Sequence, residues 1–81
     1  MNQMTIHNRL KILIAEKEIR EGRNLPYRVI SKETGLATST LTDYAKQRVS
    51  RFDASTLDTL CQYFDCQPGD ILVYSEDEPA E

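Results

Sequence analysis

Residues 27–44, YRVISKETGLATSTLTDY, carry the pattern from which the architecture of this chain follows. Pro26 precedes them and suits the first turn of a helix, where a missing backbone N–H is tolerated. Val29 and Ile30 supply the buried side of that helix. Gly35 ends it, because glycine readily adopts the left-handed conformation found just after a helix. The pattern therefore predicts a helix that stops at a short glycine turn.

A second helix follows the turn, beginning near Ala37 or Thr38 and extending over about residues 38–46. At about 100° per residue, Ala37, Leu41 and Tyr44 share one side of this helix. The opposite side carries polar side chains from Thr38, Ser39, Thr42, Asp43 and Lys46. Two helices joined by a short glycine-containing turn form the DNA-binding helix-turn-helix geometry, and the B-DNA major groove admits one α-helix. The polar helix is therefore the predicted DNA-reading element.

Apolar residues at helical spacing predict a further helix on each side of this motif. We expect the first over roughly residues 5–20, with Thr5 as its N-cap and Ile6 in its buried stripe. The other buried positions of that helix are Leu10, Leu13, Ile14 and the stem of Lys17. The later helix begins near Ser55-Thr-Leu-Asp58, which resembles a capping box, and Asp53 is the alternative cap. Its buried stripe is Leu57, Leu60, Cys61 and Phe64.

The chain then continues through a turn into a short apolar segment. Pro68-Gly69-Asp70 contains the turn-forming residues. Residues 71–74, Ile-Leu-Val-Tyr, suit either a final helical turn or a short strand. Taken together, the elements predict an all-α fold, with a short C-terminal strand as the alternative for the last segment.

Charge is distributed unevenly along the 81 residues, which are enough for one domain. We expect a DNA-binding domain over residues 1–75 and an acidic flexible tail over 76–81. The net charge is −3, yet all ten lysines and arginines lie in residues 1–51 with five acidic residues. Residues 52–81 contain eight acidic residues and no basic one. This separation favours a basic surface that binds a polyanion, with the acidic part of the chain held away from it. The alternative is that the charges are distributed this way by chance on a solvated surface.

Several classes of protein are disfavoured by what the sequence lacks. No apolar run approaches the roughly 18 residues of a membrane span, and no signal-peptide pattern is present, so we expect a cytoplasmic protein without a membrane partner. Cys61 and Cys66 lack the CxxC spacing and are expected to be free thiols. With His7 they fall short of a zinc ligand set, and no glycine-rich phosphate loop occurs. We therefore expect no enzyme, no metal and no cofactor.

The residues of the central motif also resemble a known family. Ile30 and Ser31 in the first helix, Gly35 with Leu36 in the turn, and Leu41 in a Ser/Thr-rich second helix fall at the places typical of the Cro/xenobiotic-response-element (XRE) repressor family. Later residues resemble a compact subgroup of that family: Phe52-Asp53, Thr56-Leu57, Leu60-Cys61, Phe64, Cys66 and Pro68-Gly69-Asp70-Ile71-Leu72. The resemblance covers about residues 8–74. It implies a compact, lambda-repressor-like bundle of four to five short helices and a sequence-specific transcriptional regulator, commonly a repressor that binds palindromic double-stranded DNA as a homodimer.

Position by position, the resemblance implies roles for individual side chains. Base edges would be read by Thr38, Ser39, Thr42 and Asp43. Phosphates would be contacted by Tyr27, Arg28, Lys32 and Thr40 from the first helix of the motif and the start of the second. The loop that follows would add Lys46, Arg48 and Arg51. Phosphate contacts of this kind fix the register of the protein on DNA without reading its sequence.

Three departures from the family pattern bear on these roles. Ala37 stands where a capping Ser or Thr is usual, which removes a bond worth about 1 kcal/mol. Asp43 could accept from a cytosine amino group, but its charge repels phosphate. Residues 18–24 form a longer connection than usual, and its Arg20 and Arg23 either add backbone contacts or are simply solvated.

The sequence leaves the oligomeric contact and two rival functions open. We expect the dimer contact in the apolar segment made of Ile71, Leu72, Val73 and Tyr74, through a helix end or strand pairing. One rival is a protein-interaction module, such as an antitoxin or phage-type accessory factor that sequesters a protein partner through Ile12, Ile19 or the acidic tail. Another is a redox switch or small enzyme that uses Cys61 and Cys66.

Overall fold

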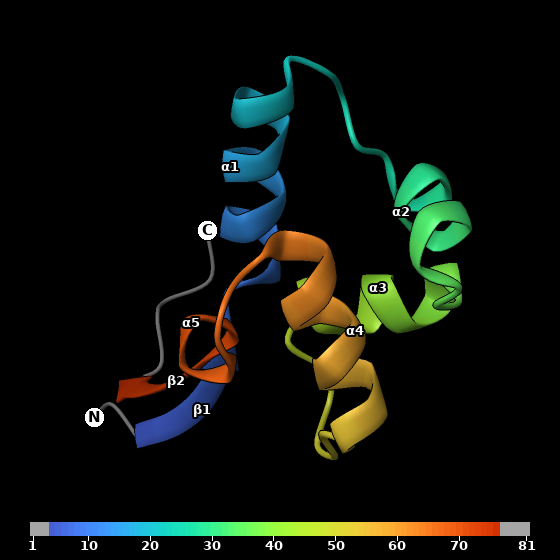
Figure 1. Cartoon of the computed structure of the whole chain (residues 1–81). Helices are drawn as coiled ribbons and strands as arrows, with labels where there is room; N and C mark the ends of the chain where they lie inside the picture. Colours follow the sequence, from blue (N-terminus) through green and yellow to red (C-terminus); the bar gives the residue numbers. More distant parts are fainter. Residues whose placement is uncertain (1–3, 77–81) are drawn as a thin grey trace.

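The computed structural model describes residues 4–76, and within this range the chain forms five helices and two short strands (Figure 1). The strands are β1 (Met4–Asn8) and β2 (Leu72–Glu76). The helices are α1 (Leu10–Glu21), α2 (Tyr27–Thr34), α3 (Thr38–Ala45), α4 (Ala54–Phe64) and α5 (Pro68–Ile71). The predicted bundle of short helices with a C-terminal strand is confirmed. No helix in the described part of the chain is long and apolar enough to cross a membrane.

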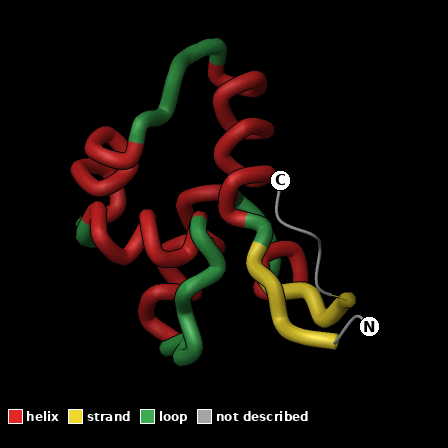
Figure 2. The backbone as a smooth tube through the Cα atoms, turned by 180° about the vertical axis from the view of Figure 1, so that it is seen from behind, coloured by secondary structure: helices red, strands yellow, loops and turns green. Residues whose placement is uncertain are grey.

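β1 and β2 form an antiparallel two-stranded sheet at the end of the molecule away from α2 (Figures 1 and 2). Ile6 of β1 lies opposite Tyr74 of β2. Both alternatives for the last apolar segment are realised in turn, because Ile71 ends α5 and the next residues form the strand. Glu76, which we assigned to the acidic tail, is the last residue of β2, and residues 77–81 of that tail lie outside the described residues.

The prediction of a helix over residues 5–20 is wrong at its start. Thr5 and Ile6 belong to β1, and α1 begins only at Leu10, so Thr5 does not cap this helix. The side chain of Asn8 instead accepts a hydrogen bond from the N–H of Leu10 at 3.2 Å. Cross-strand pairs with the C-terminal strand stabilise the extended conformation, and this non-local pairing outweighs the local helical spacing.

All five helices contribute side chains to one core, in which each buried aliphatic side chain contributes about 1.5–3 kcal/mol to folding. The buried apolar residues are Leu10, Leu13, Ile14, Leu25, Ile30, Leu41, Tyr44, Ala45, Leu60, Phe64 and Ile71. α3 contacts both α1 and α2, so the predicted DNA-reading helix rests directly on the core.

The long connection between α1 and α2 is anchored at both ends. Gly22 ends α1 in a left-handed conformation with φ of +66°. The N–H of Leu25 donates to the Glu18 carboxylate at 2.7 Å, and the Leu25 side chain is only 2% exposed. Pro26 lies at the N-cap of α2, one residue before the helix. These contacts hold the start of α2 against the core.

Asp53, rather than Ser55, caps α4. Its carboxylate accepts from the N–H of Thr56 at 3.0 Å. The Ser55 hydroxyl donates to the same carboxylate at 2.7 Å. These bonds, led by that from Ser55, lower the pKa of Asp53. The cap fixes the end of the loop that contains Arg48 and Arg51.

Candidate nucleic-acid interface

α2, a short turn and α3 form the helix-turn-helix, and side-chain bonds hold the turn in place. Gly35 ends α2 with φ of +82°, and its N–H donates to the Ser31 carbonyl at 2.8 Å. The Thr34 hydroxyl donates to the Ile30 carbonyl at 2.7 Å and accepts from the Leu36 N–H at 3.1 Å. The turn therefore fixes the direction in which α3 leaves α2.

α3 has one face in the core and one face open to solvent. Leu41, Tyr44 and Ala45 are 1%, 3% and 7% exposed, and they pack against the rest of the core. On the opposite face, the side chains predicted to read bases are exposed at Thr38, Ser39 and Asp43 and half-buried at Thr42. The helix thus presents hydroxyl and carboxylate groups outward, and each hydroxyl both donates and accepts hydrogen bonds.

The start of α3 lacks the side-chain bond that usually caps a helix. Ala37 occupies the N-cap position with φ of −66° and ψ of 146°, and no side chain caps it. This agrees with the loss expected from the departure at this position. The helix nonetheless begins at Thr38, because the Leu36 side chain and Leu41 anchor its first turn in the core.

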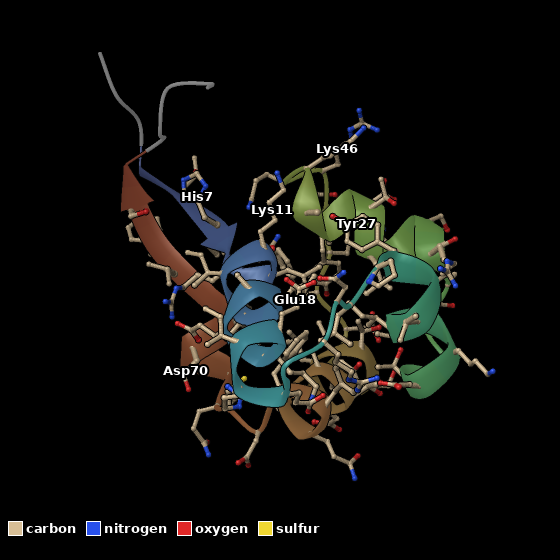
Figure 3. The ribbon with its side chains drawn as sticks, turned by 90° about the horizontal axis from the view of Figure 1, so that it is seen from above. His7, Lys11, Glu18, Tyr27, Lys46 and Asp70 are labelled. Atoms are coloured by element: carbon tan, nitrogen blue, oxygen red, sulfur yellow. The ribbon has the colours of Figure 1, made fainter. Side chains whose placement is uncertain are left out.

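The predicted phosphate contacts come from α2, from α3 and from the loop that follows α3. The cationic members are all exposed: Arg28, Lys32, Lys46, Arg48 and Arg51. No ion pair within residues 4–76 engages any of these five side chains. Thr40 is half-buried, and Tyr27 is half-buried against the core. In Figure 3, Tyr27 and Lys46 lie on the same side of the molecule. Five exposed cations of α2 and of the segment that follows α3 are therefore without an ion pair among the described residues.

Lys11 of α1 is a further cation, outside the set predicted from the sequence. It is exposed, and in the view of Figure 3 it lies on the same side of the molecule as Lys46. Asp70 of α5 lies on the other side of α1 in that view. The sequence gives no local signal for Lys11, because α1 and α3 are brought together only by the tertiary fold.

Arg23 in the α1–α2 connection is already engaged by protein carboxylates. Its guanidinium makes two hydrogen bonds to the Glu33 carboxylate, at 2.9 and 3.0 Å, and a third to Glu21 at 2.8 Å. The Tyr63 hydroxyl of α4 donates to the same Glu33 carboxylate at 2.6 Å. The Lys17 ammonium lies 4.5 Å from the centre of the Tyr63 ring. The unusual connection therefore joins α2 to α1 and α4, a role beyond the two that we considered.

This network shifts the titration of its members in the direction expected for mutual hydrogen bonding. The hydrogen bonds from Arg23, and then from Tyr63, lower the pKa of Glu33 to about 2. Burial and the bond to Glu33 raise the pKa of Tyr63 to about 12. Glu33 consequently stays ionised over the whole range in which proteins are usually handled, and the network persists there.

The candidate dimer contact is only partly available. Ile71 is completely buried in the core, whereas Leu72 and Val73 are half-buried. Tyr74 is 66% exposed, and its cross-strand neighbour Ile6 is 55% exposed. The exposed part of this candidate contact therefore lies on the two-stranded sheet, to which β1 also contributes.

The described residues give little support for a metal site or for a reactive cysteine. No group of three or more His, Cys, Asp or Glu side chains in residues 4–76 is placed to hold a metal ion. Cys61 and Cys66 are free and half-buried. Burial and the neighbouring Cys61 raise the pKa of the Cys66 thiol, which reduces the thiolate fraction needed for reactivity.

An apolar groove of about 620 Å³ lies between the sheet and α1, lined in part by His7, Ile12 and Val73.

Comparison with known proteins agrees with this geometry. A family model described as the Cro/C1-type HTH DNA-binding domain matches residues 9–77. An uncharacterised HTH-type transcriptional regulator of Bacillus subtilis (strain 168), YozG, is 32% identical over 56 residues, which cover 69% of this chain and 67% of that protein. No solved structure gives a significant match.

Proposed function

The chain belongs to the Cro/C1-type helix-turn-helix DNA-binding family, and we propose that it is a sequence-specific transcriptional repressor that reads the major groove with α3 as a homodimer. The observation that carries this proposal is the division of α3 into a buried apolar face and an exposed face of short polar side chains. A helix held in this way inserts one face into the major groove while the core keeps its backbone fixed. We place its action in the cytoplasm.

Base reading is assigned to the exposed side chains in the first half of α3. Thr38 and Ser39 lie at the helix start, where recognition helices of this motif contact base edges. Thr42 lies one helical turn after Thr38 on the same face. Asp43 is assigned to a cytosine amino group, the base donor that a carboxylate prefers.

Anchoring to DNA is assigned to cations and hydroxyls of α2, of α3 and of the loop after α3. Arg28, Lys32 and Tyr27 come from α2 and Thr40 from α3, while Lys46, Arg48 and Arg51 come from the loop after α3. These groups bind phosphates, set the register of the helix in the groove and make the affinity depend on salt. The exposure of the five cations and their lack of an ion pair among residues 4–76 support this assignment.

Dimerisation is assigned to the sheet. A single domain of this size makes few base contacts, and a second copy on a palindromic site doubles them. Tyr74 and Ile6 form an exposed apolar pair on the sheet, and Leu72 lies on the same face, while Val73 lies on the other face opposite His7. Strand edges and exposed apolar side chains of this kind suit pairing with a second copy of the chain.

A second candidate function is capture of a protein partner through α1. Ile19 is 83% exposed and Ile12 is 48% exposed, which is unusual for large apolar side chains of one short helix. A partner bound there would leave α3 free, so this function is compatible with DNA binding. A competition experiment locates the partner's binding site: a partner on α1 leaves DNA binding unchanged, whereas a partner that displaces DNA covers α3 instead.

The proposal is tested by selecting from a randomised duplex pool and measuring fluorescence anisotropy with a salt titration. We expect enrichment of a short palindrome and an affinity that falls steeply as salt rises. The triple variant Thr38→Ala/Ser39→Ala/Thr42→Ala should retain binding but lose the sequence preference. Absence of binding at low salt would contradict the proposal and leave partner capture as the leading function.

A further inference from the structure

Gln47, directly after the C-cap of α3, has an unusual backbone conformation. Its φ is +58°, and Asp65 is the only other non-glycine residue with positive φ among residues 4–76. Side chains other than glycine adopt this region at an energetic cost, so surrounding interactions must hold them there. Two backbone hydrogen bonds lie at this position. The N–H of Gln47 donates to the Tyr44 carbonyl at 3.0 Å, and the N–H of Arg48 donates to the Asp43 carbonyl at 2.8 Å.

The Gln47 side chain explains why this conformation is held. Its amide oxygen accepts from the Asn8 backbone N–H at 3.0 Å and from the Asn8 side-chain amide at 3.2 Å. Its amide nitrogen donates to the Asn8 carbonyl at 2.9 Å. One primary amide thus binds both main-chain polar groups of Asn8, as a paired strand would. Binding both the N–H and the carbonyl of Asn8 requires a side chain of this length that carries a donor and an acceptor. Ionised Glu lacks the donor, Lys lacks the acceptor, and Leu lacks both.

Asn8 is well placed to transmit this constraint. It is the last residue of β1, only 6% exposed, and its side-chain oxygen also accepts from the N–H of Leu10 at the start of α1. The Gln47–Asn8 contact therefore ties the segment after α3 to the junction of the sheet and α1. Gln47 itself lies between Lys46 and Arg48, two of the proposed phosphate contacts.

We infer that Gln47 and Asn8 are positioning residues for DNA recognition, which hold the end of α3 and the Lys46–Arg48 segment in one orientation relative to the sheet. The inference rests on the proposed function and deepens it. The two residues need touch no DNA. Their effect is on specificity, because base reading requires one register of α3, whereas phosphate binding on arbitrary sequence tolerates displaced cations.

The variant Gln47→Gly tests this inference without adding backbone strain. Glycine removes all three side-chain bonds but adopts the left-handed conformation freely. Gln47→Asn is the second variant, since asparagine also tolerates this conformation but is one methylene too short to reach Asn8. Asp65→Gly is the matched control, because it makes the same backbone change at the end of α4. Circular dichroism and thermal unfolding confirm that each variant is folded.

The measured quantity is the ratio of affinities for the selected duplex and for a random duplex at one salt concentration. We expect Gln47→Gly and Gln47→Asn to lower this ratio about tenfold, comparable with one mismatched base pair, while affinity for the random duplex stays within about twofold. Asp65→Gly should keep the wild-type ratio. An unchanged ratio in folded Gln47 variants, or equal losses on both duplexes, would overturn the inference. Failure of the proposed function is seen separately, as a wild-type protein with no preference for any duplex.

Discussion

At the scale of single residues, Ala37 is the position where the helix-turn-helix is least well satisfied. It occupies the N-cap of α3 in an extended conformation, and no side chain accepts from the first N–H groups of the helix. Serine fits that backbone conformation and supplies the missing acceptor. The departure from the family pattern was visible in the sequence because it depends on one residue and its immediate neighbours.

Ala37→Ser should stabilise the domain by about 0.5–2 kcal/mol, the usual contribution of a serine cap. Urea unfolding followed by circular dichroism measures this free energy. Ala15→Ser makes the same substitution at an exposed position inside α1, where serine is a poorer helix former than alanine. Equal effects of the two substitutions would show that capping is not what limits α3.

Arg48→Ala should weaken binding to all duplexes alike and reduce the salt dependence of log K by about 1, the change expected for one lost phosphate contact. Anisotropy titrations at several salt concentrations give this slope. Arg20→Ala is the control, because Arg20 lies in a hollow with Asp65 and Asp70, away from α3. A slope that falls equally in both variants would mean that only net charge matters.

At the scale of elements, the parts of the fold that depend on nearby residues could be predicted. α2, its glycine turn and α3 follow from local spacing, and Asp53 was one of two alternatives for the cap of α4. β1 could not be predicted, because its partner β2 lies some sixty residues later in the chain and the same residues fit a helical stripe. The hydrogen bonds between Asn8 and Gln47 were missed for the same reason.

The contact of α2 with α1 and α4 predicts a pH effect on stability. The pKa of Glu33 is lowered from 4.5 to about 2 in the folded protein. A carboxylate with a lowered folded pKa stabilises the fold above its unfolded pKa, and this contribution is lost as the pH falls through the folded value. The stabilisation by Glu33 is therefore complete above about pH 4.5 and disappears toward pH 2.

Glu33→Gln should accordingly have a lower melting temperature than wild type at pH 7, and the gap should close as the pH is lowered toward 2. Thermal unfolding across this range measures the gap. Glu16→Gln removes an exposed carboxylate from α1 with no partner among the described hydrogen bonds and ion pairs, and should track wild type throughout. A constant gap for Glu33→Gln would show that the carboxylate charge is not what joins these helices.

At the scale of the whole molecule, the sheet and the helix-turn-helix occupy different ends of one small domain (Figures 1 and 2). The charge separation along the chain was predictable by counting, and so was the polar face of α3. The dimer contact that we propose differs from the segment expected from the sequence, since Ile71 is completely buried and Ile6 of β1 lies opposite Tyr74. The position of Ile6 opposite Tyr74 depends on the pairing of β1 with β2, which a single sequence does not reveal.

Tyr74→Asp should convert a wild-type dimer to a monomer, because it places a charge in the exposed apolar pair of the sheet. Size-exclusion chromatography with light scattering gives the mass directly. Ile19→Asp introduces the same charge at a more exposed apolar residue on α1 and should remain a dimer. A monomeric wild type would contradict the proposed dimer, and loss of the dimer only in Ile19→Asp would move the contact from the sheet to α1.

The central claim, that α3 reads the major groove, is tested most directly by altering single groups of the selected duplex. Replacing guanine with 7-deazaguanine, or adenine with 7-deazaadenine, removes an acceptor from the major groove alone, and replacing guanine with inosine removes the amino group in the minor groove. Anisotropy should show a loss of affinity of about 1–3 kcal/mol at one or more 7-deaza positions and none with inosine. Affinity that is insensitive to every 7-deaza substitution but falls with inosine would contradict major-groove reading by α3.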